Sequence, residues 1–192
     1  GFEAERYLLE EYNSEHIHLK NDSKELVFMV MFRTIPEDST GVAHILEHTT
    51  LCGSEKFKVR DPFFMMLRRS MSTFMNAFTA SDWTAYPFAT QNKKDFFNLL
   101  DVYLDAVYFP LLEEDDFKQE GHRLEFSKLD KSSSDLEYKG VVFNEMKGSM
   151  SNISNTTWQA LTKNLFPDLT YRNNSGGAVS YTHLTLPTII TV

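Results

Sequence analysis

The stretch His44-Ile-Leu-Glu-His48 constrains the fold more than any other, because it places two histidines and a glutamate within five residues. On a helix, residues four apart lie one above the other on the same face. His44 and His48 would therefore project from one face about a turn apart, with Glu47 leaning toward the same side. A core helix would carry leucines on such a face, so this helix must border a polar site.

Two imidazoles at this spacing can bind one tetrahedral metal ion. Glu47 could reach a metal-bound water without being a ligand, and zinc lowers the pKa of such a water toward about 7. A carboxylate can then take the proton as the water attacks a carbonyl. The order H-x-x-E-H is the inverted zinc motif. Histidine pairs also arise by chance on helices, and catalytic zinc needs a third protein ligand, so the motif alone leaves both interpretations open.

Composition excludes several classes of protein. The chain has 192 residues and a net charge of −8, which disfavours a nucleic-acid partner and mildly favours basic ligands. No apolar run approaches the roughly 18 residues of a membrane helix, so no membrane association is expected. The single cysteine, Cys52, rules out an internal disulfide. We expect a soluble piece of a larger protein, with any targeting segment outside these residues.

Local patterns predict both strands and helices. The apolar run 25–34 predicts a strand buried on both faces, and the residues around Ala80-Ser81-Asp82 predict a hairpin. Four helical segments are expected. The first surrounds the zinc motif, capped by Ser39 or Thr40 and closed by Gly53, and the second opens at Asp61 and Pro62. The third covers 92–109 and the fourth 118–126, and a linker is expected at 128–138. Residues 139–166 should be largely helical. This mixture, without strict strand–helix alternation, predicts an α+β fold with a largely antiparallel sheet packed with helices.

Several separate segments carry a family resemblance. They are DSTGVAHILEHTTLCGSEKF, RDPFFMMLRRSMSTFMNAFTASDWTAYPFATQN, DFFNLLDVYLDAVYFP, FKQEGHRLEF and YKGVVFNEMKGSMS. Together they closely resemble the presequence protease branch of the pitrilysin-type metallopeptidases. The resemblance covers residues 1–177 and implies an incomplete N-terminal metallopeptidase domain of pitrilysin/insulysin-like fold. Residues 178–192 match nothing, so we treat them as a tail from a truncation or sequence junction, and His183 receives no function.

The resemblance implies a set of site residues. It makes His44, His48 and Glu145 the ligands of one Zn²⁺ per chain, and Glu47 the base that activates water. From the residues alone, Glu145 would be an ordinary solvated carboxylate, and only the match to NEMKG reverses that interpretation. Asn76 and Ala77 lie in a segment that looks like the edge strand along which substrate peptides bind through backbone groups; an ordinary hairpin strand is the alternative.

Other polar residues are expected to have lesser roles. Glu120 and Glu125 are candidates for orienting the imidazoles from behind. His16, His18 and His122 are expected to be surface or packing residues. Cys52 is expected to be a small packed residue rather than a nucleophile, with sensitivity to oxidation as a secondary hypothesis.

The resemblance also implies a function. Such enzymes are large zinc oligopeptidases whose two halves enclose a chamber, and they degrade cleaved targeting presequences and other short unfolded peptides in organelles. The mitochondrial matrix is the expected location. The C-terminal half, which supplies an Arg and a Tyr to the transition-state pocket, is missing, so this chain alone should cleave peptides poorly or not at all.

Two alternatives compete with the peptidase. One is a non-catalytic scaffold homologue, such as a core subunit of a respiratory complex or a partner in a processing peptidase. Such subunits typically lose part of the zinc set, which is complete here. The other is a structural zinc domain, which usually has four protein ligands and often uses cysteine; Cys52 would be the only thiol.

Overall fold

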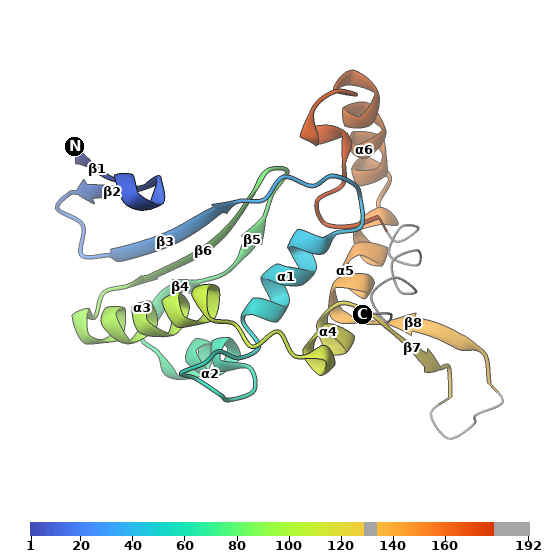
Figure 1. Cartoon of the computed structure of the whole chain (residues 1–192), viewed down its shortest axis with the longest axis horizontal. Coiled ribbons are helices and arrows are strands. Elements are labelled where there is room, and N and C mark those ends of the chain that lie inside the picture. The colour runs from blue at the N-terminus through green and yellow to red at the C-terminus, as the bar shows by residue number, and fades with distance from the viewer. Residues whose placement is uncertain (129–133, 179–192) are drawn as a thin grey trace.

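The computed structural model describes residues 1–128 and 134–178, and Figure 1 shows how their helices and strands are arranged. In chain order the elements are β1 (Glu3–Leu9), η1 (Glu10–Tyr12), β2 (Ser14–Lys20), β3 (Leu26–Arg33), α1 (Val42–Thr50), α2 (Pro62–Arg69), β4 (Ser72–Met75), β5 (Phe78–Thr79), β6 (Trp83–Thr90), α3 (Lys93–Tyr108), α4 (Glu114–Glu120), β7 (Arg123–Phe126), β8 (Leu136–Lys139), α5 (Val141–Met150), α6 (Ile153–Leu165) and η2 (Thr170–Arg172). The predicted α+β class is confirmed. No helix in the described residues is both long enough and apolar enough to cross a membrane.

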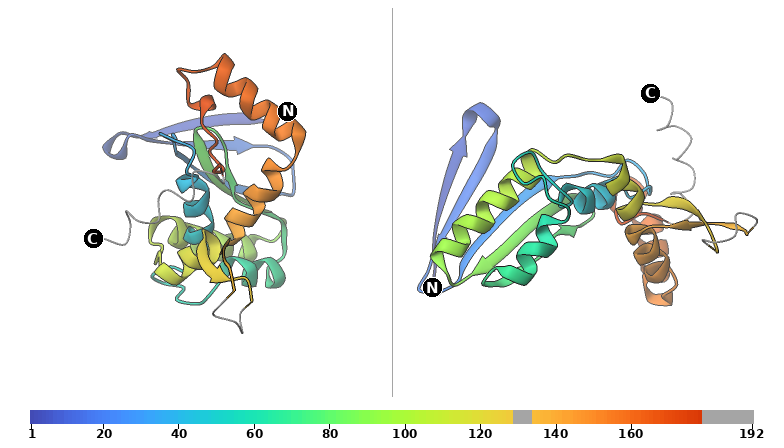
Figure 2. Two further views of the ribbon diagram at one scale, coloured as in Figure 1. Left: turned by 90° about the vertical axis from the view of Figure 1, so that its right-hand side faces the viewer. Right: turned by 90° about the horizontal axis from the view of Figure 1, so that it is seen from below.

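The main sheet is built around β6. This strand pairs antiparallel with β3 on one side and with β4 and β5 on the other. Both α2 and α3 lie on one face of the sheet, as the view from below in Figure 2 shows. Between these helices and the sheet, Phe88 of β6 and Leu99 and Tyr103 of α3 are almost completely buried and form the centre of the core. The predicted hairpin is confirmed, since Ala80 N–H donates to Trp83 O (2.8 Å) in the turn between β5 and β6.

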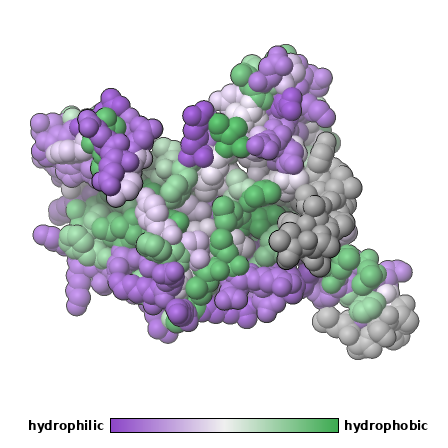
Figure 3. All heavy atoms as spheres, in the orientation of Figure 1, coloured by the Kyte–Doolittle hydropathy of each residue, from purple (hydrophilic) through white to green (hydrophobic). Residues whose placement is uncertain are grey.

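The prediction that β3 is buried on both faces is wrong. Phe28 and Phe32 pack against the core, whereas Val27, Met29 and Met31 on the opposite face are 53–65% exposed. β3 is an edge strand, and the described helices cover only one side of the sheet. Figure 3 shows apolar residues on the face between the β1–β2 hairpin and α6.

The limits of the motif helix also differ from the prediction. α1 begins at Val42, directly after Gly41 in the left-handed conformation (φ 78°), and it ends at Thr50, before Gly53. Ser39 and Thr40 do not cap it, because the N-cap position falls on Gly41 and the helix has no side-chain cap hydrogen bond. Their hydroxyls bond elsewhere: Ser39 Oγ accepts from Asn174 N–H (3.0 Å), and Thr40 Oγ1 donates to Asp38 Oδ1 (2.6 Å). By contrast, the predicted N-cap and first residue of α2, Asp61 and Pro62, are confirmed.

The helix expected over 118–126 lies earlier in the chain. α4 covers Glu114–Glu120, where acidic residues in the first turn favour a helix start. After Gly121 the chain forms β7, which pairs antiparallel with β8. Of the linker expected at 128–138, residues 136–138 belong instead to β8 and pair with β7; residues 129–133 lie outside the described part of the chain.

The helical prediction for 139–166 is largely right, but the segment forms two helices. α5 ends at Met150, and Asn152 caps α6 by accepting from Ser154 N–H (2.9 Å). Beyond η2 the described chain ends at Ala178. The predicted unmatched tail, 178–192, falls almost wholly outside the described residues, as does His183.

Candidate metal and catalytic site

Helix α1 supplies three polar side chains to one site. His44 and Glu47 are only 8% and 7% exposed, and His48 is partly buried beside them. α1 contacts α4, α5 and β5, which surround the polar face of the helix. The structure therefore places the motif on a helix, with both imidazoles on one side as the spacing predicts.

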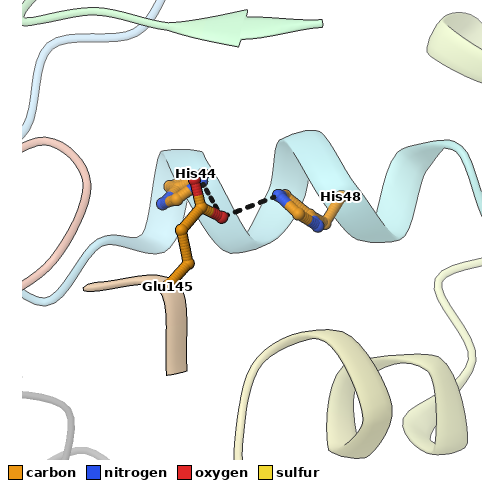
Figure 4. A group of neighbouring side chains, drawn as sticks. All are labelled: His44, His48 and Glu145. Carbon is orange, nitrogen blue, oxygen red and sulfur yellow. Dashed lines mark ion pairs between the residues drawn. The ribbon is translucent and has the colours of Figure 1, made fainter. Parts of the chain in front are cut away.

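Glu145 reaches the same place from α5. Its Oε2 lies 3.6 Å from His44 Nε2 and 3.8 Å from His48 Nε2, and Figure 4 shows the carboxylate between the two rings. The Glu145 side chain is 56% exposed, so this ligand candidate approaches from the open side. Two residues of the motif and a third 101 positions away thus converge, as the family resemblance implies.

Each imidazole is held by its other ring nitrogen. His44 Nδ1 lies 2.9 Å from the backbone oxygen of Gly176, and His48 Nδ1 lies 3.0 Å from Glu120 Oε2. A carbonyl and an ionised carboxylate can only accept, so both Nδ1 atoms carry the hydrogen. In the neutral rings, both Nε2 lone pairs are then free, and both point at Glu145.

The His48–Glu120 pair shifts the pKa of both groups. Burial acts to lower the pKa of His48, but the hydrogen bond to Glu120 and three nearby carboxylates outweigh it, so the pKa is raised. The hydrogen bond from His48 holds the pKa of the Glu120 carboxyl below its ordinary value, although burial acts the other way. Because both shifts favour the charged forms, the pair is a strong anchor for this ring.

These three side chains fit a metal ion. Among the described residues they are the only group of three or more His, Cys, Asp or Glu ligand atoms that all lie within 4.8 Å of one another. Tetrahedral coordination at about 2.0–2.1 Å puts ligand atoms roughly 3.3–3.4 Å apart, only slightly less than the two distances to Glu145. Two imidazoles and one carboxylate are a donor set typical of catalytic zinc.

Glu47 is held by a residue that sequence analysis missed. Thr79, on β5, donates its hydroxyl to Glu47 Oε2 (2.5 Å). The other oxygen, Oε1, has no hydrogen-bond partner among the described residues. No local pattern pointed to Thr79, because the hairpin brings it to α1 only through the tertiary fold. The geometry leaves Glu47 oriented, buried and able to accept a proton.

A groove opens beside Glu47 and His48. Apolar side chains form much of its wall, including Leu51, Phe63, Phe64, Leu67 and Met75. Carboxylates border it as well. Burial raises the pKa of Asp116, with further contributions from nearby Asp61 and Glu113, so acidic groups cluster at this end of the site.

Asn76 and Ala77 also line this groove, just past the end of β4. Asn76 N–H donates inward to Pro87 O (3.1 Å), and Ala77 N–H donates to the side-chain oxygen of Asn76 (2.9 Å). Both residues are thus near the metal ligands, but both amides are already bonded. An incoming peptide would have to displace the Asn76 side chain to reach the Ala77 amide.

The structure separates the two candidates for orienting an imidazole. Glu120 contacts His48, as described above. Glu125 instead pairs with Arg123 (2.7 Å) and Lys139 (3.7 Å) on the β7–β8 hairpin, and the structure does not bring it to the imidazoles.

The structure gives the remaining candidates no part in the group of ligand atoms, although Cys52 lies beside it, in the wall of the groove. His16 and His18 are exposed on β2, and His122 is buried between the rings of Phe117 and Tyr138. Cys52 is 5% exposed, and burial raises the pKa of its thiol to about 12. Such a thiol forms little thiolate, which makes it a poor nucleophile and a poor target for oxidation.

Comparisons with known proteins agree with this geometry. Residues 33–165 match the model of the insulinase family, peptidase family M16. Proteins named mitochondrial presequence protease from Danio rerio and Saccharomyces cerevisiae are 60% and 52% identical to the chain over 164 residues. These matches cover 85% of this chain but only 16% of each relative.

Solved structures show the same fold at low sequence identity. A protease from Helicobacter pylori is 16% identical, with a TM-score of 0.71 over 95% of this chain and 40% of that one. Pitrilysin is 18% identical, with a TM-score of 0.67 over 94% of this chain and 18% of its own. The predicted pitrilysin-like fold is thereby confirmed.

Proposed function

Since the chain belongs to the insulinase family of peptidases, M16, we propose that it is the metal-binding part of a zinc endopeptidase that cleaves short unfolded peptides, such as organellar targeting presequences. The observation that carries this proposal is the convergence of His44, His48 and Glu145 beside a buried, oriented Glu47. The names of the similar proteins point to presequences as substrates.

His44, His48 and Glu145 are the proposed ligands of one zinc ion. Zinc, when bound, supplies Lewis acidity that polarises a peptide carbonyl and acidifies water. The residues behind the ligands hold the rings in place: Glu120 and the Gly176 carbonyl keep both Nδ1 atoms occupied, so only Nε2 faces the site.

Glu47 is the proposed general base. Thr79 fixes one carboxylate oxygen, which leaves Oε1 to take the proton from a water that attacks the scissile carbonyl. The same carboxyl can then return the proton to the departing amine. Glu47 needs no large movement for either step, because α1 places it next to the ligand His48.

The groove beside Glu47 is the proposed binding site for the substrate. Its wall of Leu51, Phe64, Leu67 and other apolar side chains suits a bulky apolar residue next to the scissile bond. The acidic groups around Asp116 and Asp61 favour peptides with positive charges, a property of many targeting peptides. Asn76 and Ala77 are the proposed backbone contacts at the edge of the sheet.

The complete enzyme requires more polypeptide than this chain. The chain spans about 16% of the length of the curated relatives it matches. We propose that residues 1–177 form an incomplete N-terminal domain, that 178–192 do not belong to it, and that the remaining polypeptide completes the site. By itself the chain would bind zinc but cleave peptides poorly. The relatives' names favour the mitochondrion as its compartment, with the matrix as the proposed location.

The decisive test compares the complete polypeptide with its Glu47→Gln form, with Glu125→Gln as the control. For all three proteins the rate of cleavage of a basic presequence peptide and the zinc content per chain are measured. We expect Glu47→Gln to keep one zinc per chain and to lose about 10²–10⁴-fold in turnover, whereas Glu125→Gln stays near wild type. A Glu47→Gln form as active as wild type would refute the assignment, and wild-type protein without zinc or peptidase activity would favour a scaffold homologue.

A further inference from the structure

A short segment after η2 contacts the site from behind. We call residues Asn173–Gly177 the strap. It lies beyond the residues matched by the family model, 33–165. Its bonds to the loop before α1 run from Asn173 Nδ2 to Pro36 O (2.9 Å) and from Asn174 N–H to Ser39 Oγ (3.0 Å). The strap is therefore tied to the chain that leads into the motif helix.

The peptide group between Gly176 and Gly177 is held at both ends. Its carbonyl accepts from His44 Nδ1 (2.9 Å), and its N–H donates to Asn174 O (3.0 Å). The preceding amide, Gly176 N–H, donates to the side-chain oxygen of Asn174 (3.1 Å). One residue, Asn174, thus sets the direction in which the Gly176 carbonyl points.

Two glycines allow the strap to lie against the start of α1. Gly41 and Gly177 both have positive φ angles, 78° and 99°. A Cβ on Gly41 would lie 2.7 Å from Gly177 Cα and 2.8 Å from Gly176 O. Any side chain at Gly41 would therefore collide with the same carbonyl that binds His44. Glycine at position 41 therefore lets the Gly176–Gly177 peptide group lie close enough to α1 to bond to the His44 imidazole.

The strap also contacts α5, the helix that carries Glu145. A Cβ on Gly176 would lie 2.8 Å from Met146 Sδ, and Asn174 Nδ2 lies 3.5 Å from Met150 Sδ. The strap hence lies against both helices that supply the proposed ligands. A segment that only closed the surface would not need a polar contact with a ligand ring.

We infer that Asn174 is a positioning residue for metal binding, which acts through the Gly176 carbonyl to fix the orientation and tautomer of His44. The inference rests on the proposed function. The carbonyl can only accept, so it keeps the hydrogen on Nδ1 and leaves the Nε2 lone pair 3.6 Å from Glu145 Oε2. Glu120 keeps the hydrogen on Nδ1 of His48 with a charged carboxylate, whereas the strap keeps it on Nδ1 of His44 with a neutral carbonyl, which adds no charge to the site.

The alternative is that the strap only stabilises the fold. The two roles differ in what Asn174→Ala changes. Loss of a stabilising turn lowers thermal stability and leaves zinc affinity intact. Loss of a partner that orients a ligand weakens metal binding about 10–100-fold and changes the geometry of the bound ion.

The chain offers a matched control. The side-chain oxygen of Asn152 accepts the same kind of bond, from the N–H two residues further on, at the start of α6 (2.9 Å). Asn152→Ala therefore removes a comparable local bond away from the strap. Asn174→Asp keeps an oxygen acceptor for Gly176 N–H and serves as the conservative rescue.

The experiment uses the complete polypeptide and measures zinc affinity by chelator competition, the visible spectrum of the Co²⁺-loaded form, and thermal unfolding without metal. We expect Asn174→Ala to bind zinc about 10-fold more weakly with an altered Co²⁺ spectrum. Asn174→Asp should recover most of this loss, and Asn152→Ala should bind zinc like wild type. Wild-type affinity and an unchanged spectrum in Asn174→Ala would overturn the inference.

Two further outcomes are also decisive. If Asn174→Ala does not fold, Ser39→Ala takes its place, because it removes the acceptor of Asn174 N–H; the same loss of affinity supports the inference, and wild-type affinity overturns it. If the wild-type protein binds no zinc, the proposed function fails and the inference fails with it. Wild-type zinc binding with unaffected variants refutes the inference alone.

Discussion

The two sides of the proposed metal site differ in how firmly they are held. On α1, His44 and Glu47 are less than 10% exposed, and each group of the motif has a bonded partner behind it: Gly176, Thr79 or Glu120. On α5, the Glu145 side chain is 56% exposed. Among the described residues its polar neighbours are the two imidazoles.

This difference indicates how the site is assembled. The side formed by α1 is preorganised, because its rings and its carboxylate are fixed before any ion arrives. On the α5 side we expect a bound ion to order Glu145, because the ion pairs of its exposed carboxylate in the described residues are only those with the two imidazoles. Changes on the α5 side should therefore affect metal binding alone, whereas changes on the α1 side should affect metal binding and stability together.

The largest effect is expected on the open side. Glu145→Ala removes one of the three proposed ligands, so zinc affinity should fall by at least about 100-fold, above the usual cost of losing an outer partner. Because the side chain is exposed, the melting temperature of the metal-free protein should hardly change. Glu114→Ala, which removes another exposed helix carboxylate, is the control. A Glu145→Ala form that keeps its zinc would show that this glutamate is not a ligand.

On the preorganised side, Glu120→Gln should weaken zinc binding about 10–100-fold and also destabilise the metal-free protein by about 1 kcal/mol. The raised pKa of His48 gives stability that is full below its unfolded value and is lost as pH rises through the folded value. The lowered pKa of Glu120 gives stability that is lost only as pH falls through its own folded value.

The difference in unfolding free energy between wild type and Glu120→Gln should therefore be larger at pH 6 than at pH 8.5. Urea unfolding of the metal-free proteins at both pH values measures it. A difference that is the same at both values, or larger at pH 8.5, would contradict the ion pair.

The smallest effect concerns the groove next to the α1 side. Leu67 is 48% exposed on α2, so Leu67→Ala should leave folding intact. It should reduce kcat/KM about 10-fold for a peptide with a bulky apolar residue at the cleavage site, and less for the same peptide with alanine there. Equal losses for both peptides would mean that this wall does not select side chains.

Site residues could be predicted from the sequence only where the residues near them in the chain carry the signal. Helical spacing alone predicted that His44, Glu47 and His48 share one side of a helix, and the family resemblance then gave them their roles at a zinc site. Glu145 followed only from the family resemblance, because nothing in its own neighbourhood marks a ligand. Thr79 could not be found, since it meets Glu47 only after the β5–β6 hairpin has formed.

The same limit applies to the strap and to the fold. The Gly176 carbonyl carries no residue-type signal and lies 132 positions from His44. The β1–β2 hairpin was not predicted either, because nearly all of its side chains are exposed. The misplaced helix at 118–126 shows that a helical pattern gives way where Gly121 ends the helix and β8 offers a partner strand.

The most direct test of the central claim is anomalous diffraction at the zinc edge on crystals of the Glu47→Gln form of the complete polypeptide. The account predicts one zinc ion about 2.0–2.2 Å from His44 Nε2, His48 Nε2 and a Glu145 oxygen, with both Nδ1 atoms still bonded to Gly176 and Glu120. Zinc bound through Nδ1, or bound without Glu145, would contradict it.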